Sequence, residues 1–210
     1  IIQGYMHLLS ERSTNDSEIA EIINVIANAT KRGTGLVQQL LTLARKTQPQ
    51  LQPTAVDAML RELLRLLDQT FPKNIEVNLV SNNQLPLINV DLNQMTQALL
   101  NICINARDAM PNGGKLTFEA KVVDGQTVAD DHETTAARYV CIAITDTGAG
   151  MDADTQNRIF EPFFTTKPIG QGTGLGLSVT YGIVKTHDGF VKVDSKPTEG
   201  TTFRIYLPAR

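Results

Sequence analysis

Three polar side chains in the stretch 91–110 have the types and spacing of a metal site. Asn101, Asn105 and Asp108 stand at i, i+4 and i+7, so they share one face of a predicted helix whose opposite face carries Leu99 and Ile102. Amide and carboxylate oxygens suit Mg²⁺, which takes few protein ligands and completes its shell with phosphate and water. A solvated helix face has the same pattern, so the stripe alone leaves both interpretations open.

A carboxylate followed by glycines marks a second candidate site. Asp146 comes directly after the apolar stretch 139–145, and Gly148 and Gly150 follow it. Glycines let a backbone approach a ligand closely, and an ionised Asp only accepts hydrogen bonds. Asp146 therefore suits the exocyclic amine of adenine and opposes the carbonyl of guanine. The Asp-Thr-Gly sequence also forms ordinary turns, so this motif alone is weak.

A glycine-rich run, GQGTGLGL over 170–177, leads into a predicted helix at about 175–186. Glycines at such a place let backbone N–H groups and a helix N-terminus face phosphates. The run follows the loop 163–168 (FFTTKP) and not a strand, which excludes a dinucleotide-binding βαβ fingerprint. It contains no Gly-Lys-Ser/Thr, which excludes a P-loop.

Mixed helices and strands position these motifs. Residues 48–53 (QPQLQP) read as a proline-bounded linker, after which helical and extended patterns mix. This order favours a two-layer α/β sandwich, and hence the α+β class for the chain as a whole. The predicted helices cover about 57–70, 91–110, 154–160 and 175–186, and the predicted strands 74–80, 87–90, 115–123, 138–146, 189–195 and 201–207, with an acidic loop after 123.

Residues 1–47 have a purely helical pattern. Helices are predicted over 1–12 and 17–45, on either side of a polar turn, and the second helix carries an apolar heptad seam. A short partner helix cannot cover so wide a stripe, so we expect two hairpins to form a dimeric four-helix bundle. The alternative is a hairpin docked on the chain's own second domain. The seam consists of Ile19, Ile22, Ile26, Ala29, Gly33, Leu36, Leu40 and Leu43.

The composition excludes several classes of protein. Hydrophobic residues make up 41% and charged residues 20% of the chain, which is typical of a globular protein. A net charge of −3 gives no basic surface for nucleic acid or an anionic membrane, and no apolar run is long enough to span a bilayer. Cys103 and Cys141 stand in apolar stretches, which predicts buried, reduced thiols and a cytoplasmic location, in a parent protein that can still be membrane-anchored.

In this order the motifs resemble those of the histidine kinases of the GHKL ATPase superfamily. The resemblance covers essentially the whole chain and implies a helical hairpin, residues 1–47, truncated at its N-terminus, before a Bergerat-fold ATP-binding domain, residues 54–210. The similar segments are LLNICINARDAM (99–110, N box), DTGAGM (146–151, G1 box), RIFEPFFTTK (158–167, F box), GQGTGLGLS (170–178, G2 box), the closing strand EGTTFRIYLP (199–208), and RGTGLVQQLLTLAR (32–45), which is similar to the second dimerisation helix of the nitrogen-regulation subgroup.

The resemblance implies which residues bind Mg·ATP. Asn105 would be the Mg²⁺ ligand, Asn101 would lie on the phosphate side, and Asp146 would read the adenine amine. Phe160 would anchor a lid, roughly 162–174, that folds over the phosphates and carries Lys167. The implied ATP-binding residues are Asn101, Asn105, Asp108, Asp146, Gly148, Gly150, Met151, Phe160, Lys167, Gly170, Gly172, Thr173, Gly174, Leu175, Gly176 and Thr201.

The N box departs from the common family pattern at one position. Many histidine kinases have Lys or Arg three residues after the metal-binding Asn, whereas this chain has Asp108. The acidic residue is similar to that of the nitrogen-regulation subgroup and of the gyrase-like ATPases. We therefore expect no basic contact to phosphate from this position of the helix.

None of the three histidines fits the family's phosphoacceptor. Segment 2–4 (IQG) resembles a pattern that follows the acceptor, so we expect that histidine roughly two helical turns before Ile1. His7 is then interpreted as a bundle residue and His132 as part of a solvated acidic loop. His187 precedes a turn and is expected to have no special role.

The implied function is that of a protein-histidine kinase core. The intact protein would transfer the γ-phosphoryl of Mg·ATP to a histidine on the dimerisation helix and then to an Asp of a response regulator. It would act as a homodimer, and this chain alone would bind ATP without phosphorylating itself. One rival is a GHKL ATPase that activates water, which needs a Glu base where this chain has Asn101. The other is a non-catalytic module that senses ATP.

Overall fold

The computed structural model describes residues 23, 25–27, 30, 49–81, 85–131, 136–168 and 172–210. The chain divides into two compact units, Ile1–Lys46 and Thr47–Arg210. In the first unit residues 23, 25–27 and 30 are helical, and the hydroxyl of Thr30 donates to the carbonyl of Ile26 at 2.8 Å. The rest of the predicted hairpin, including His7, lies outside the described residues, so the bundle stays a prediction.

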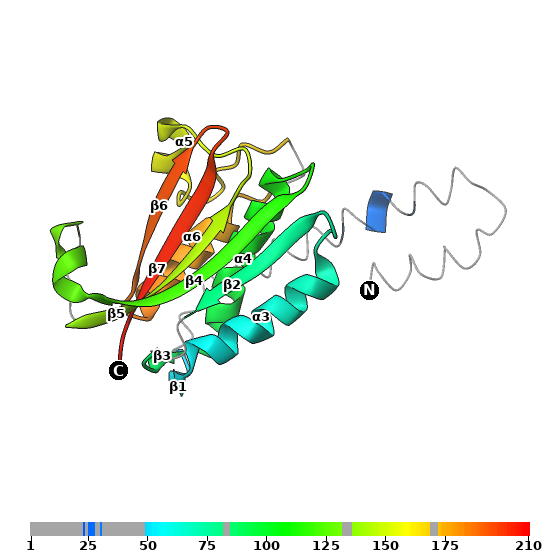
Figure 1. Ribbon diagram of the computed structural model, residues 1–210. Coiled ribbons are helices and arrows are strands. Elements are labelled where there is room, and N and C mark those ends of the chain that lie inside the picture. Colours follow the sequence, from blue (N-terminus) through cyan, green and yellow to red (C-terminus); the bar gives the residue numbers. More distant parts are fainter. Residues whose placement is uncertain are drawn as a thin grey trace. The chain divides into compact units, whose positions relative to one another are not determined.

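A five-stranded sheet with the strand order β2-β4-β5-β7-β6 forms the centre of the second unit (Figure 1). Only its first pair, β2 with β4, is parallel, and the other three pairs are antiparallel. A separate antiparallel pair joins β1 to β3. The strands are β1 (Gln52–Thr54), β2 (Ile75–Ser81), β3 (Ile88–Val90), β4 (Gly114–Asp124), β5 (Arg138–Asp146), β6 (Phe190–Lys196) and β7 (Gly200–Pro208).

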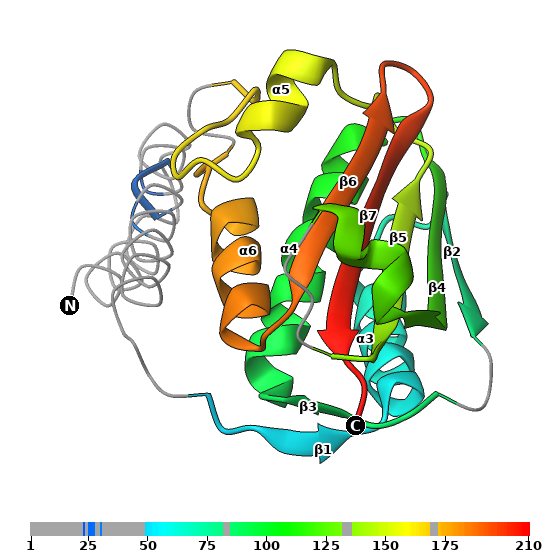
Figure 2. The same cartoon turned by 90° about the vertical axis from the view of Figure 1, so that its left-hand side faces the viewer.

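Three long helices cover one face of this sheet, as Figures 1 and 2 show. They are α3 (Val56–Thr70), α4 (Leu92–Ala109) and α6 (Gly176–Thr186), while α5 (Ala153–Arg158) is a short helix at one end of the sheet. In α3 the buried residues Val56, Met59, Leu60, Leu63 and Leu67 recur every three or four positions, so the helix presents one apolar stripe to the core. The predicted two-layer α/β sandwich is thus confirmed for this unit.

Two elements differ from the predicted pattern. Residues Gln52–Thr54 form β1, so the expected linker 48–53 ends inside the small sheet of the second unit. Pro53 lies in this strand opposite Asn89, and β1 is an edge strand of its two-stranded sheet, where a missing N–H is tolerated. The acidic loop after β4 begins with a 3₁₀ helix, η1 (Gly125–Asp131). His132 follows it and lies outside the described residues.

His187 has a structural role that its place before a turn does not indicate. Its side chain is buried, Nε2 accepts the backbone N–H of Asp91 at 2.9 Å, and Nδ1 lies 2.7 Å from the carbonyl oxygen of Ile183. A ring that accepts at Nε2 donates at Nδ1, so these partners select one neutral tautomer. The expectation of no special role is therefore wrong, because His187 joins the end of α6 to the start of α4.

Asp91 caps α4 and also holds the chain that precedes β1. Its Oδ1 accepts the N–H groups of Asn93 and Gln94 at 3.0 and 3.1 Å, and its Oδ2 accepts that of Gln50 at 3.0 Å. Burial opposes ionisation of this carboxyl, but the three N–H groups outweigh it and lower the pKa of Asp91.

Asp91→Ala should lower the free energy of unfolding by about 1 kcal/mol at neutral pH, the typical loss for an N-cap. Because the folded-state pKa is depressed, the charge stabilises the fold above the unfolded pKa of 3.8, and this contribution disappears as pH falls through the lower folded value. Urea titrations of both proteins at pH 7 and near pH 3 measure it. Asp68→Ala, which removes an exposed partner of Lys73, is the control and should change little. A loss that is the same at both pH values would contradict a charged cap.

Both cysteines are buried and free, as the sequence predicts. Burial raises the pKa of the Cys103 thiol to about 12, so this thiol stays protonated and unreactive. Among the helices that the structure describes, none combines the length and the apolar character needed to cross a membrane.

Candidate functional site

The polar face of α4 contacts two other segments. The side-chain amide of Asn101 donates to the carbonyl of Gly176 in the first turn of α6 at 3.0 Å. One turn later, Oδ1 of Asn105 accepts a hydrogen bond from Lys167 Nζ at 3.3 Å. Both asparagines are half-buried, whereas Ile102 and Ala106 on the other face belong to the core. At Asn101 and Asn105 this face therefore contacts other segments of the chain, whereas Asp108 at the end of the stripe is more exposed.

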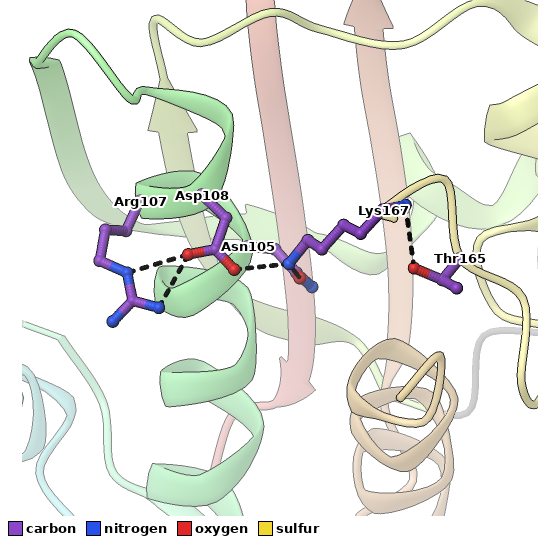
Figure 3. A network of polar contacts seen from close by, with 5 residues as sticks. All are labelled: Asn105, Arg107, Asp108, Thr165 and Lys167. Atoms are coloured by element: carbon purple, nitrogen blue, oxygen red, sulfur yellow. Dashed lines mark hydrogen bonds and ion pairs between the residues drawn. The ribbon is translucent and has the colours of Figure 1, made fainter. Parts of the chain in front are cut away.

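Asp108 connects α4 to the predicted lid through ion pairs (Figure 3). Its Oδ2 lies 2.5 Å from Lys167 Nζ, and its Oδ1 lies 3.0 and 2.7 Å from Nε and Nη2 of Arg107. Burial raises the pKa of Asp108, but the two cations outweigh burial and bring this pKa below its usual value. Asp108 is therefore an ionised carboxylate with a cation on each oxygen.

Asp146 is the last residue of β5, and its carboxylate is fixed by backbone donors. The residue is 4% exposed, and its Oδ1 accepts the N–H of Gly148 at 2.8 Å. Burial raises the pKa of Asp146, and the backbone N–H groups of Gly148 and Thr201 act against this rise. Thr201 lies opposite Asp146 in the β5–β7 pair, which places two of the predicted residues side by side.

The glycines after Asp146 permit close backbone packing. A Cβ atom on Gly148 would lie 2.7 Å from Cβ of Ala109, at the end of α4. Gly150 has φ +65°, and its Cβ would lie 1.9 Å from the carbonyl oxygen of Lys196. The glycines of the 146–151 segment thus allow its backbone to pack closely against the end of α4 and against the β6–β7 hairpin.

Residues of the β6–β7 hairpin hold the 146–151 segment, and sequence reasoning missed them. Ser195 Oγ accepts the N–H of Met151 at 2.9 Å and donates to the carbonyl of Gly200 at 3.0 Å. The N–H of Thr198 donates to the carbonyl of Ala149 at 2.7 Å. Because these bonds join segments far apart in the sequence, no local spacing pattern could have indicated them.

The two ends of the predicted lid meet at one backbone hydrogen bond. The N–H of Phe163 donates to the carbonyl of Gly174 at 2.9 Å, and both residues have positive φ angles. The hydroxyl of Thr173 then accepts the N–H of Leu175, a buried residue that leads into α6. Phe160, the predicted lid anchor, packs against Tyr181 of α6 with ring centroids 5.3 Å apart.

The predicted site residues fall into three connected groups. Asn105 and Asp108 meet Lys167, Asn101 meets Gly176, and the Asp146 segment lies against the end of α4 and against Thr201. Asn105 Oδ1 accepts a hydrogen bond from a lysine ammonium group, so this oxygen faces a cation, and its role as a Mg²⁺ ligand stays a prediction. Gly170 lies outside the described residues, and its role stays a prediction.

Asn105→Ala should weaken nucleotide binding by about tenfold when Mg²⁺ is present, the scale of one charge-assisted contact. The loss should be much smaller in EDTA, because the removed oxygen would then have no metal to bind. Calorimetric titration with ATP under both conditions measures the difference. Asn157→Ala, in the exposed surface of α5, is the matched control. An equal loss in Mg²⁺ and in EDTA would show that Asn105 is structural.

Comparison with known proteins identifies close relatives of this chain. Residues 90–210 match the family described as histidine kinase-, DNA gyrase B-, and HSP90-like ATPase. The chain is 40% identical to the sensor kinase CckA of Brucella abortus, over 99% of this chain and 22% of that protein. It is 33% identical to the sensor histidine kinase ZraS of Escherichia coli, over 99% of this chain and 42% of that protein. The chain therefore spans less than half the length of these relatives.

Solved structures of two kinases share the fold. Full-length ShkA in complex with AMPPNP gives a TM-score of 0.79 at 24% identity, over 99% of this chain and 42% of that one. The histidine kinase ThkA in complex with the response regulator TrrA gives a TM-score of 0.71 at 21% identity, over 100% of this chain and 57% of that one. Membership of the nitrogen-regulation subgroup stays a prediction. The matched family and the named relatives agree, and the chain belongs to the histidine kinase-, DNA gyrase B- and HSP90-like ATPases, among their histidine kinases.

Proposed function

We propose that this chain binds Mg·ATP as the catalytic part of a sensor histidine kinase. The observation that carries the proposal is the meeting of three distant segments at the end of α4. Lys167 of the lid bonds Asn105, and the glycine segment after Asp146 packs on Ala109. This arrangement brings a candidate metal ligand and a basic side chain together, and the segment after Asp146, the candidate adenine-binding residue, packs against the end of the same helix. The AMPPNP in the ShkA structure supports a nucleotide as the ligand.

Each group has a distinct task in this proposal. Asp146 accepts the exocyclic amine of adenine, while the bare backbone at Gly148 and Gly150 lies against the base. Asn105 holds Mg²⁺, which, when bound, neutralises charge on the phosphate oxygens. The start of α6 and the glycines before it direct backbone N–H groups toward the phosphates. The chain thus contributes positioning and charge neutralisation, the main requirements of phosphoryl transfer.

The side chains around α4 favour transfer of the phosphoryl group to a protein nucleophile rather than hydrolysis of ATP by an activated water. Asn101 stands where a hydrolytic relative needs a base, and its amide is bonded to Gly176. Asp108, the carboxylate nearest to Asn105 on this face, has a cation on each oxygen, and these cations lower its pKa. A carboxylate with a lowered pKa is a weak base. We therefore propose that a histidine on the helical hairpin of a homodimer accepts the γ-phosphoryl, and that a response-regulator Asp receives it next.

Incubation of the full-length protein with γ-labelled ATP tests this function. The expected product is a protein label that is stable in base and lost in acid, as for phosphohistidine, and that passes to a receiver domain. Asp146→Asn should reduce the label, whereas His7→Ala should keep it. Release of inorganic phosphate without labelled protein would show an ATPase. Binding of ATP with neither product would show a sensing module.

A further inference from the structure

The basic side chain that contacts the C-terminal part of α4, Lys167, belongs to the lid. An acidic residue of the helix, Asp108, binds it. We propose that Asp108 is a positioning residue for Lys167, which it holds where the ammonium group can neutralise the terminal phosphate of a bound nucleotide. This inference rests on the proposed function, because it assigns a role toward the nucleotide in the same site. Asp108 itself is neither a metal ligand nor a base in this proposal.

The Lys167–Asp108 pair is less exposed than the other pairs of a lysine with a carboxylate in the described ranges. Their side chains are 30% and 28% exposed, whereas Lys73–Asp68 and Lys196–Glu199 are 66–83% exposed. Exposed pairs contribute little because water screens them and because both side chains must be ordered. Partial burial and a second bond to Asn105 at 3.3 Å make the Lys167 position much better defined.

The lid backbone is also shaped around Lys167. The N–H of Lys167 donates to the hydroxyl of Thr165 at 3.2 Å, which fixes a local turn. A Cβ on Gly172 would lie 2.7 Å from that hydroxyl and 3.2 Å from Cδ of Lys167. The other arm of the lid therefore lies directly against the lysine stem, and only a glycine fits there without displacing its neighbours.

The ammonium group has enough donors to bind Asp108 and phosphate together. Lysine carries three N–H donors, of which one points to Asp108 and one to Asn105 in this structure. If Asn105 held Mg²⁺, the second donor of Lys167 would be available to a phosphate oxygen while the bond to Asp108 stayed in place. A carboxylate alone would repel the nucleotide, but Asp108 with Arg107 and Lys167 forms a group with net positive charge.

Variants that move the positive charge from the lid to the helix test the proposal, and the only quantity measured is nucleotide affinity. Calorimetry with Mg·ATP and Mg·ADP is applied to Lys167→Ala, Asp108→Ala, the double alanine variant, and Lys167→Ala combined with Asp108→Lys. We expect Lys167→Ala to weaken ATP binding by about tenfold and ADP binding much less, the scale of one charge-assisted bond to the terminal phosphate. Asp108→Ala should weaken ATP binding by less than Lys167→Ala does. The double variant should bind ATP no more weakly than Lys167→Ala.

The relocated lysine should recover most of the ATP affinity, since position 108 lies within one side chain's reach of the same place. Glu119→Ala and Lys121→Ala, which break an exposed pair on β4, are the matched controls and should bind as the parent does. Thermal melts of every variant check the fold, and Asp108→Glu should keep the coupling to Lys167 if Asp108 acts through its charge.

Three results would overturn the proposal. Tighter ATP binding by Asp108→Ala would show that this carboxylate repels nucleotide. Losses that multiply in the double variant would show that the two residues act independently. Equal losses for ATP and ADP would place Lys167 away from the terminal phosphate. A parent chain that binds no ATP would instead refute the proposed function.

Discussion

Asp146→Asn is expected to weaken ATP binding by about 1–3 kcal/mol, the cost of leaving a buried polar group unmatched. The substituted amide has one acceptor oxygen and one NH₂ group. The backbone N–H groups of Gly148 and Thr201 both require an acceptor from this side chain, so the oxygen faces them. The NH₂ group is then directed toward the adenine amine, so two hydrogen-bond donors face each other and no hydrogen bond forms. Calorimetric titration of the variant and the parent with ATP measures the loss.

Nucleotide selectivity gives an independent measure of the same contact. The parent should prefer ATP to GTP, and Asp146→Asn should narrow this preference, because guanine presents a carbonyl where adenine presents an amine. Asp152→Asn is the matched control, since Asp152 caps α5 by accepting the N–H of Thr155 and an asparagine caps equally well. Equal ATP affinity of the Asp146 variant and the parent would refute the adenine assignment.

Gly150→Ala should destabilise the fold by at least about 2 kcal/mol, the scale of a non-glycine residue forced into the left-handed region. The added Cβ would also lie 1.9 Å from the carbonyl oxygen of Lys196, so the β6–β7 hairpin would have to move. Because that hairpin holds Met151 through Ser195, ATP binding should fall with stability. Urea unfolding and ATP titration of the variant measure the two effects.

Gly182→Ala is the matched control for that experiment. Gly182 lies inside α6, and a Cβ there meets nothing within 4 Å. Alanine is favoured over glycine in a helix interior by about 0.5–1 kcal/mol, so this variant should be slightly more stable than the parent. If both variants changed stability equally, the left-handed conformation at Gly150 would not be the cause.

The parts of the fold that depend on local patterns could be predicted from the sequence. The predicted strand 138–146 coincides with β5, because a central strand reads as a continuous apolar run. The predicted helix 91–110 agrees with α4 to within a residue at each end, since its apolar and polar residues recur on opposite faces. Both elements carry candidate site residues at their ends, so the motifs were placed correctly relative to the secondary structure.

Features that depend on tertiary pairing could not be predicted in this way. His187 accepts the N–H of Asp91, and Ser195 accepts the N–H of Met151. In both cases the two partners are distant in the sequence. Strand β1 forms only because β3 offers it a partner, and its own sequence of Gln, Pro and Thr gives no alternation of apolar and polar residues. The ion pair between Asp108 and Lys167 likewise required the positions of both segments.

The backbone bond between Phe163 and Gly174 makes the lid a loop with fixed ends. Closing a flexible loop costs entropy that grows only with the logarithm of its length, by about 0.6 kcal/mol for each doubling. The segment between these two residues can therefore lengthen or shorten at little thermodynamic expense, while α6 and the sheet keep their places. The length and sequence of this loop can thereby vary independently of the segment after Asp146, which other parts of the chain hold.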